Sequence, residues 1–218
     1  MFQRIKNLLF PPKCVLCRSL LSEEETDLCR SCREKMPVYD GRKIGLSFVA
    51  DWSALWYYKD DVRTSILRFK FGNTRSYASV YGRLLAMHLQ SRNKDSFDIL
   101  TWVSTGTRRK WKRGYDHAKL IAAATARELN VPLTKTLRKT RHTPPQSTIF
   151  GAAQRRANVL GAYAAVHPEN FRGKHVLLLD DILTTGATAS ECARTLLTAG
   201  AKKVTFAAVA AASHDTKK

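Results

Sequence analysis

The segment 175–188, HVLLLDDILTTGAT, constrains the fold of this chain more than any other part of the sequence. Four consecutive apolar residues, 176–179, run into two adjacent carboxylates, Asp180 and Asp181. A continuous apolar run is typical of a strand buried on both faces, as the strands of parallel sheets are. Ligands of such sheets bind beyond the carboxyl ends of the strands, so we expect a ligand site at the two acids.

The turn that follows the acids suits an anion. Its residues are Thr184, Thr185, Gly186, Ala187 and Thr188, and they open a helix whose first N–H groups and partial positive charge favour a phosphate. Carboxylates accept hydrogen bonds from the vicinal hydroxyls of a ribose or from water on a divalent metal. The segment therefore predicts a site for a ribose that carries a 5′-phosphate. Thr188 and Glu191 also match a capping box, so two interpretations of Thr188, ligand contact and helix cap, stay open.

The remaining sequence alternates strand and helix signals, which favours an α/β fold with a parallel sheet flanked by helices. Strands are expected within residues 52–61, 98–104, 131–139, 161–166, 175–181 and 204–212. One helix is expected to bury Tyr77, Val80, Tyr81, Leu84 and Met87, and a third to bury Ala189, Cys192, Ala193, Leu196 and Leu197. Between them a second helix is expected within 116–129, with Asp116 as one candidate for its N-cap. The polar segment 141–158 holds two prolines and is expected to be a long mobile loop.

Four cysteines near the N-terminus form two CxxC pairs, Cys14 with Cys17 and Cys29 with Cys32, with eleven residues between the pairs. Each CxxC turn presents two thiolates from one bend, and two such turns supply the four tetrahedral ligands of a structural zinc ion. Such a module can carry a nucleic-acid surface, mediate a protein contact or only stiffen the N-terminus. Cys192 lies alone on an apolar helix face, where core packing is expected.

Charge indicates the kind of partner. The chain carries 37 Lys and Arg against 18 Asp and Glu, a formal net charge of +19, which favours a polyanionic partner. No apolar run approaches the ~20 residues of a membrane span, and the N-terminal segment 2–9 is too short for the apolar core of an export signal. We therefore expect a cytoplasmic protein without a membrane span.

The segment LLLDDILTTGAT resembles the signature with which type I phosphoribosyltransferases bind phosphoribosyl pyrophosphate (PRPP). The chain as a whole is similar to a narrower family, the ComF or competence protein F type. The similarity is carried by the four-cysteine module after Pro11-Pro12, by LRFKFG and RRKWKRGYDHA, by the stretch from Gln146 to Val159, and by the PRPP motif.

The resemblance implies a four-cysteine zinc-binding module over residues 1–45 and a phosphoribosyltransferase-like domain over 46–218. Within that domain, 46–95 is an accessory region and 96–218 the core. The family's implied role is the handling of single-stranded DNA in the cytoplasm during natural transformation. PRPP with Mg²⁺ is the implied small ligand, and DNA-uptake or recombination proteins are possible partners.

Two segments depart from the family pattern. Members usually have a Pro-Val-Pro type loop where this chain has Val103-Ser104-Thr105-Gly106, and that loop meets the pyrophosphate in the transferases. Ser104, Thr105, Gly106 and the nearby Arg108 are therefore the expected pyrophosphate loop here. The second departure is Tyr115-Asp116-His117, where the family tends to have Phe-Asn-Gln.

The segment 107–117 places cations beside aromatic rings, the combination that binds single-stranded nucleic acid through phosphates and stacked bases. The expected nucleic-acid-binding residues are Arg108, Arg109, Lys110, Trp111, Lys112 and Arg113, together with Arg155 and Arg156 in the basic loop. The same cations are close enough in sequence to neutralise the phosphates of PRPP, so a shared role is expected.

Three functions remain open from the sequence. The first is a DNA-handling protein that keeps a PRPP site on a phosphoribosyltransferase fold. The second is an active phosphoribosyltransferase of nucleobase or nucleotide metabolism, and the third is a zinc-dependent nucleic-acid-binding regulator. The intact PRPP motif opposes the third, and the charge favours the first over the second.

Overall fold

The computed structural model of the chain describes residues 11–41, 44–92, 96–106, 114–141, 143 and 151–212. Its helices are α2 (Arg30–Lys35), α3 (Asp60–Phe71), α4 (Tyr77–Arg92), α6 (His117–Leu129), α7 (Ala152–Val159) and α8 (Ala187–Thr198), with a 3₁₀ turn η2 (Pro168–Asn170). Its strands are β1 (Asp51–Tyr57), β2 (Ile99–Trp102), β3 (Leu137–Lys139), β4 (Tyr163–Ala165), β5 (His175–Leu183) and β6 (Lys203–Ala211).

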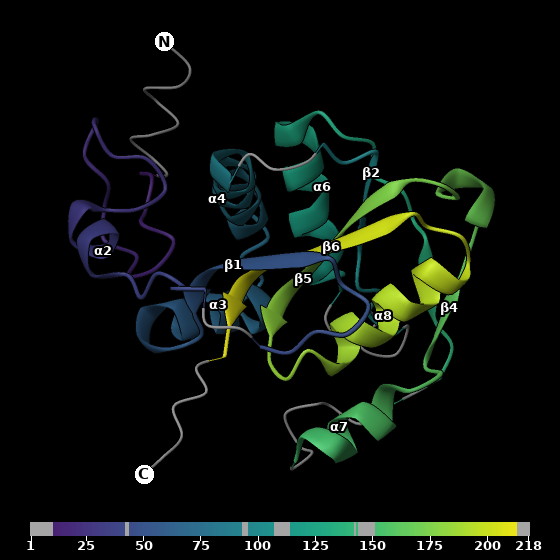
Figure 1. The fold of residues 1–218 in the computed structure, drawn as a ribbon. Coiled ribbons are helices and arrows are strands. Elements are labelled where there is room, and N and C mark those ends of the chain that lie inside the picture. Colours follow the sequence, from purple (N-terminus) through teal and green to yellow (C-terminus); the bar gives the residue numbers. More distant parts are fainter. Residues whose placement is uncertain are drawn as a thin grey trace.

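Four strands form one parallel sheet in the order β1-β6-β5-β2 (Figure 1). Its central strands β5 and β6 are nearly continuous in apolar character, as strands covered on both faces must be. Helices α4 and α6 cover one face and α8 covers the other (Figure 1). The predicted α/β class, a parallel sheet flanked by helices, is confirmed.

Alternate residues of β5 supply two separate apolar cores, because successive side chains of a strand point to opposite faces. Leu177 and Leu179 pack in the core shared with α3, α4 and α6. Val176 and Leu178 pack in the core beneath α8, where Cys192 is fully buried as expected. Both cores flank the strand that carries Asp180 and Asp181, so the position of the acids is fixed from both sides.

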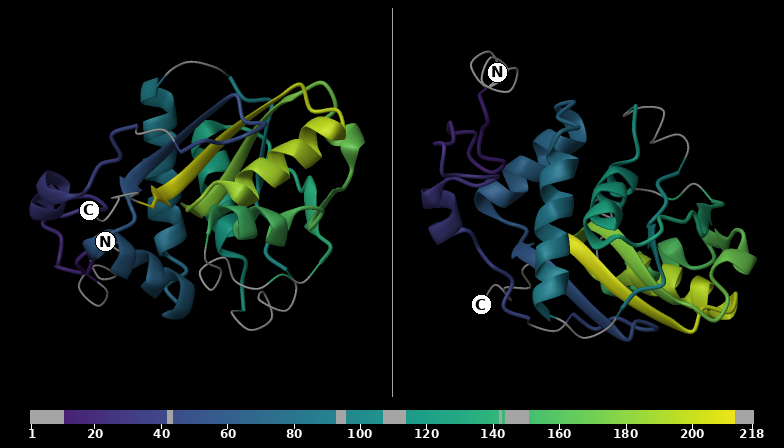
Figure 2. Two further views of the ribbon diagram at one scale, coloured as in Figure 1. Left: turned by 60° about the horizontal axis from the view of Figure 1, so that its bottom comes forward. Right: turned by 90° about the horizontal axis from the view of Figure 1, so that it is seen from above.

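Strands β3 and β4 lie outside the main sheet and pair with each other in antiparallel register. Both segments were predicted as strands, but each is only three residues long in the structure. The β3–β4 pair and the cysteine-bearing segment lie at opposite sides of the sheet (Figure 1 and Figure 2).

The segment 141–158 was expected to be one long loop, and this prediction is wrong at its C-terminal end, where α7 forms. The helix follows Gly151, whose φ of +82° is readily adopted by glycine. It carries no apolar stripe: Val159 is the one buried residue among those whose side chains are described. A short helix with a single buried contact leaves no periodic signal in the sequence.

The buried face of α4 is also rotated from the predicted one. Tyr81 is buried as expected, but Met87 is 59% exposed, and Gly82, Leu85 and Ala86 take the inner positions. Small residues lie inward because α4 packs closely on α6. A Cβ atom on Gly82 would meet the Cβ of Ala124 at 2.3 Å.

Across the ranges that the structure describes, no helix is both long enough and apolar enough to cross a bilayer.

Candidate ribose-phosphate site and cysteine cluster

The two acids lie where β5 extends beyond the end of its neighbour β2. Strand β2 ends at Trp102, which pairs with Leu179, whereas β5 continues through Asp180 to Leu183 beside β6 alone. The chain leaving β2 turns away at Val103, whose N–H donates to the carbonyl of Leu179 at 2.9 Å. The loop 103–106 and the end of β5 therefore diverge from adjacent strands and bound a cavity at the carboxyl edge of the sheet.

Asp181 is held by a lysine that lies 111 positions earlier in the chain. The Nζ of Lys70, at the end of α3, is 2.9 Å from Oδ1 of Asp181, and the two side chains are 16% and 14% exposed. An ion pair this sheltered is screened less by salt than a surface pair. It fixes α3 against the end of β5.

Asp180 has different surroundings. Its carboxylate accepts the backbone N–H of Asp181 at 2.8 Å. Burial raises the pKa of Asp180 well above its usual value, and the neighbouring carboxylate of Asp181 raises that pKa further, while the Lys70 ammonium opposes both. Asp180 can therefore take up a proton at a pH where an ordinary aspartate stays ionised.

Asp116 holds the loop 104–106 in place. Its carboxylate accepts hydrogen bonds from the backbone N–H and the hydroxyl of Thr105, at 3.4 and 3.2 Å, and from the N–H of Lys119 at 3.2 Å. The last bond makes Asp116 the N-cap of α6, which was one of the roles that the sequence left open. Burial raises the pKa of Asp116.

The hydroxyl of Ser104 donates to the carbonyl of Leu137 in β3 at 2.7 Å. The Ser104 and Thr105 hydroxyls, which the sequence suggested as donors to an anion, therefore donate to protein oxygens in this structure.

The cavity between these walls has a volume of about 510 Å³, within the ordinary range for small-molecule sites. Eight of the predicted site residues line it: Ser104, Thr105, Gly106, Asp180, Asp181, Thr184, Gly186 and Thr188. Thr185 and Ala187 are not among its lining residues. The predicted residues Arg108, Arg109, Lys110, Trp111, Lys112 and Arg113 lie outside the described part of the chain.

The capping-box interpretation of Thr188 is wrong. Helix α8 begins at Ala187, and its N-cap is Gly186 with φ +77°, so Thr188 lies inside the first turn. Glu191 accepts instead from the N–H of Gly161 at 2.8 Å and from the guanidinium of Arg194, whose hydrogen bonds lower the pKa of Glu191. Glu191 thereby fastens the chain after α7 to α8.

Glycine is favoured at position 186 because its φ is positive. A Cβ atom there would also lie 2.3 Å from Cδ2 of Leu46, so the Leu46 side chain would have to move. The N–H of Ser47 also donates to the hydroxyl of Ser190 at 3.1 Å. The segment around Leu46 therefore packs on the start of α8 from outside the sheet.

Several cavity residues were not assigned to the site from the sequence. Lys139 of β3 donates to the hydroxyl of Thr143 at 2.7 Å and lies 5.4 Å from the ring centroid of Tyr163. Lys70 had no assigned role, and its position in the LRFKFG segment was the available signal. The other lining residues on this side are Tyr58, Arg63, Leu67 and Phe71. Nothing in the sequence singled out Arg63, because its helix was not predicted.

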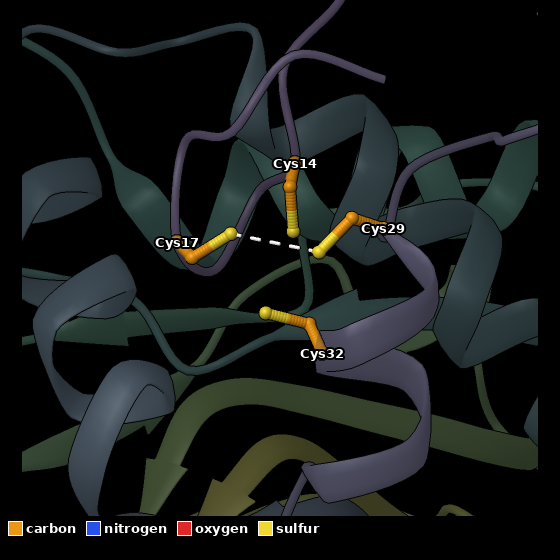
Figure 3. Close-up of side chains that lie close together, drawn as sticks. All are labelled: Cys14, Cys17, Cys29 and Cys32. Carbon is orange, nitrogen blue, oxygen red and sulfur yellow. Dashed lines mark hydrogen bonds between the residues drawn. The ribbon is translucent and has the colours of Figure 1, made fainter. Parts of the chain in front are cut away.

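The four N-terminal cysteines converge (Figure 3). Their sulfur atoms lie within 4.8 Å of one another, and the sulfurs of Cys17 and Cys29 are 3.6 Å apart. Four sulfurs at 2.3 Å from one ion in tetrahedral geometry would be about 3.8 Å apart, so the cluster fits a zinc ion with no open position. Cys14, Cys29 and Cys32 are buried, which suits a structural metal.

The cysteine-bearing segment packs directly on α3 and α4. The hydroxyl of Ser65 donates to the carbonyl of Val15, and the guanidinium of Arg68 donates to that of Leu16. Arg83 of α4 forms two hydrogen bonds with the carboxylate of Asp27, at 2.5 and 2.8 Å. Helix α3 therefore contacts the cysteine module through Ser65 and Arg68, and it reaches the cavity through Lys70.

Comparison with known families agrees with both parts of the structure. The phosphoribosyl transferase domain matches residues 117–218, which include β5, α8 and β6. The double zinc ribbon domain matches residues 5–43, which include all four clustered cysteines. A structural zinc ion is thus supported both by the cysteine geometry and by the family match.

Curated relatives match most of the chain. Competence protein F of Haemophilus influenzae is 26% identical over 215 residues, 88% of this chain and 93% of that protein. The DNA utilization protein YhgH of Escherichia coli O157:H7 is 30% identical over 181 residues, 81% of this chain and 74% of that protein. The solved structure of an allosteric regulatory enzyme of purine biosynthesis is 21% identical, with a TM-score of 0.44, and covers 64% of this chain and 29% of that one.

Proposed function

Because the chain belongs to the family of competence protein F and the DNA utilization protein YhgH, we propose that it serves the uptake or use of DNA. In this proposal it binds PRPP or a related ribose phosphate in the cavity and handles single-stranded DNA in the cytoplasm during natural transformation. The printed names of the relatives support the DNA role, and the phosphoribosyl transferase match supports the ribose-phosphate ligand.

The observation that carries the small-ligand proposal is the convergence of two segments on one cavity. Asp180 and Asp181 offer acceptors for the two ribose hydroxyls, and the N-terminus of α8 beside Thr184 and Gly186 offers N–H groups to the 5′-phosphate. The loop 104–106 faces the same space and would meet the pyrophosphate. Mg²⁺, when bound with the pyrophosphate, would neutralise part of its charge.

Removal of both acids tests the small-ligand proposal. The double variant Asp180→Asn with Asp181→Asn should weaken PRPP binding at least about 100-fold, because two charge-assisted hydrogen bonds of about 1.5–3 kcal/mol each are lost. Isothermal titration calorimetry with PRPP and Mg²⁺ measures the change. Asp51→Asn is the control, since Asp51 is half exposed and pairs with Arg92 away from the cavity. Unchanged affinity in a folded double variant would contradict the assignment.

Transferase activity is the second candidate, favoured because an acid pair and the loop 104–106 line the same cavity. Such an enzyme would hold both ends of PRPP while the acids steady a positively charged sugar in the transition state. Pyrophosphate release from PRPP decides between the candidates, measured with a panel of nucleobases, with and without single-stranded DNA, and with the double variant as the blank. If PRPP binds but pyrophosphate is released under none of these conditions, turnover with those bases is excluded.

The third possibility from the sequence, a zinc-dependent regulator without a small-molecule site, is the least supported. It gives no reason for a cavity in which loop 104–106 and the PRPP motif meet.

A further inference from the structure

The last turn of α3 carries Lys70, and side chains from the start of α6 hold its backbone. Helix α3 ends at Phe71, so the carbonyls of its last turn have no partner within the helix. The hydroxyl of Tyr115 donates to the carbonyl of Phe69 at 2.6 Å. The ring Nε2 of His117 lies 3.2 Å from the carbonyl of Lys70, which can only accept, so this nitrogen carries the hydrogen. Two residues of one segment therefore supply the donors that this end of α3 lacks.

Both hydrogen bonds are sheltered from water. Tyr115 is 7% exposed and His117 is 2% exposed. Their ring centroids are 4.5 Å apart, and both rings contact the ring of Phe69, at 6.1 and 5.1 Å. Loss of either donor leaves a buried carbonyl without its partner, which costs more than the loss of an exposed hydrogen bond. The last turn of α3 is therefore held firmly against the start of α6.

Lys70 connects this junction to the acid pair. Its carbonyl lies 3.2 Å from Nε2 of His117, and its ammonium nitrogen lies 2.9 Å from Oδ1 of Asp181. Asp116, the residue between the two donors, holds the loop 104–106 through Thr105. Three consecutive residues, the second segment that departs from the family pattern, therefore fix both α3 and that loop beside the cavity.

We propose that Tyr115 and His117 are positioning residues of the ribose-phosphate site. By holding the last turn of α3, they keep the Lys70 ammonium on Asp181, and they thereby keep the Asp181 carboxylate oriented to accept a ligand hydroxyl. Neither side chain lines the cavity, so both act on the ligand through Lys70 and Asp181. The inference rests on the proposed function, because affinity for PRPP is the property that this positioning raises.

Two donor variants, Tyr115→Phe and His117→Leu, test the positioning. Phenylalanine keeps the ring at position 115 and its contact with Arg75, whose guanidinium carbon lies 4.8 Å from the ring centroid. Isothermal titration calorimetry with PRPP and Mg²⁺ should show a loss of affinity of about 2- to 30-fold in each variant, the range over which networks of packed and hydrogen-bonded residues modulate a distant site. His117→Gln, whose amide can also donate, should bind PRPP more tightly than His117→Leu. Wild-type affinity in both folded donor variants would overturn the proposal.

The Lys70→Met variant separates an action through Lys70 from a general loss of stability. If Tyr115 acts through Lys70, Tyr115→Phe should cause no further loss of PRPP affinity in the Lys70→Met background. Additive losses would overturn the proposal. Thr205→Val is the matched control, because the Thr205 hydroxyl is also buried and is 2.9 Å from Nε2 of His175 at the amino end of β6. It should lower the Tm and leave PRPP affinity unchanged.

A measurement without ligand separates the inference from the proposed function. Burial and the carboxylate of Asp181 raise the pKa of Asp180, and the Lys70 ammonium opposes them. If Lys70 moves away in the two donor variants, the pKa of Asp180 should rise further, which carbon-13 NMR titration of its carboxyl group measures. The Asp116 carboxylate also raises the pKa of Asp180, so a lowered pKa would report movement of Asp116 in place of Lys70.

Wild-type protein that fails to bind PRPP would contradict the small-ligand part of the proposed function, and the titration alone would then decide the inference. A raised pKa of Asp180 in both donor variants supports the positioning role, whereas an unchanged or lowered pKa overturns it. The Tm of each variant shows that it is folded, as expected because Val62, Ile66 and Phe69 still hold α3 in the core.

Discussion

Asp180 and Asp181 are consecutive in β5, yet their carboxylates have different partners. Asp181 pairs with Lys70 at 2.9 Å. Asp180 lies beside the negative charge of Asp181, and its carboxylate accepts a hydrogen bond from the backbone N–H of Asp181. Because the Asp180 carboxylate is costly to ionise in the folded protein, its ionisation lowers the stability of the fold.

The pKa of Asp180 makes a prediction for stability. An acid whose folded-state pKa is raised favours folding when it is protonated, and that contribution is lost as the pH rises through the folded-state pKa. Asparagine stays neutral throughout, so Asp180→Asn should match the wild type near pH 4 and exceed it at pH 8. The Tm of Asp180→Asn should therefore exceed that of the wild type by an amount that grows as the pH rises.

Thermal unfolding of both proteins between pH 4 and 8 measures this difference. Asp51→Asn serves as the control, and its Tm should differ from that of the wild type by the same small amount at every pH. A Tm for Asp180→Asn below that of the wild type at pH 8 would show that ionised Asp180 stabilises the fold.

At the scale of elements, α3 joins the cysteine module to the cavity and was not expected from the sequence. Its apolar residues Val62, Ile66 and Phe69 do have helical spacing, but the charged residues between them and the aromatic Phe71 after them obscure the stripe. The contact of α3 with the cavity also depends on the ion pair between Lys70 and Asp181. No local sequence pattern predicts a pairing between residues so distant in the chain.

Segments whose structure is determined by residues close together in the sequence were predicted well. The run 175–188 folded as a buried strand, a turn and a helix, because hydrophobic pattern and turn chemistry agree there. The Asp116 cap was likewise among the roles that its position before a periodic segment suggested. By contrast, the capping box at Thr188 failed because Gly186, in a left-handed conformation, starts α8 two residues earlier.

The packing of α4 on α6 makes a second stability prediction. A Cβ atom added at Gly82 would lie 2.3 Å from Cβ of Ala124 and 2.8 Å from the backbone nitrogen of Thr125, so the helices must move apart. Although alanine favours helix over glycine by about 1 kcal/mol, we expect Gly82→Ala to lose a net 1–3 kcal/mol, roughly, through overpacking.

Urea unfolding measures the effect of Gly82→Ala, with Gly45→Ala as its control. A Cβ atom at Gly45 has no neighbour within 4 Å, so that variant should stay within about 0.5 kcal/mol of the wild type. Equal stability of the two variants would mean that α4 and α6 adjust without cost.

At the scale of the whole molecule, a cavity that holds two acids sits in a chain of net charge +19. In the proposed function the acids accept hydrogen bonds from ribose hydroxyls, and basic residues elsewhere in the chain contact phosphates. Among the predicted nucleic-acid-binding residues that the structure describes, Arg155 and Arg156 lie on α7, whose last residue, Val159, lines the cavity.

The charge predicts how DNA binding depends on salt. If five basic residues contact phosphates, log K for single-stranded DNA should fall against log[salt] with a slope of about −3.5, from ~0.7 per contact. Between 50 and 200 mM salt that slope corresponds to a loss of affinity of about 100-fold. Fluorescence anisotropy with labelled oligo-dT across this range gives the slope directly.

Arg156→Ala should reduce the magnitude of the slope by ~0.7, because it removes one phosphate contact and the exposed Arg156 supports no core packing. Arg127→Ala is its matched control: Arg127 is exposed on α6 and does not line the cavity, so the slope should be unchanged. PRPP affinity should be the same in both variants, which separates a DNA contact from a change in the ribose-phosphate site. A slope near zero in the wild type would exclude phosphate contacts as the basis of binding, and equal slopes for the two variants would place the DNA path away from α7.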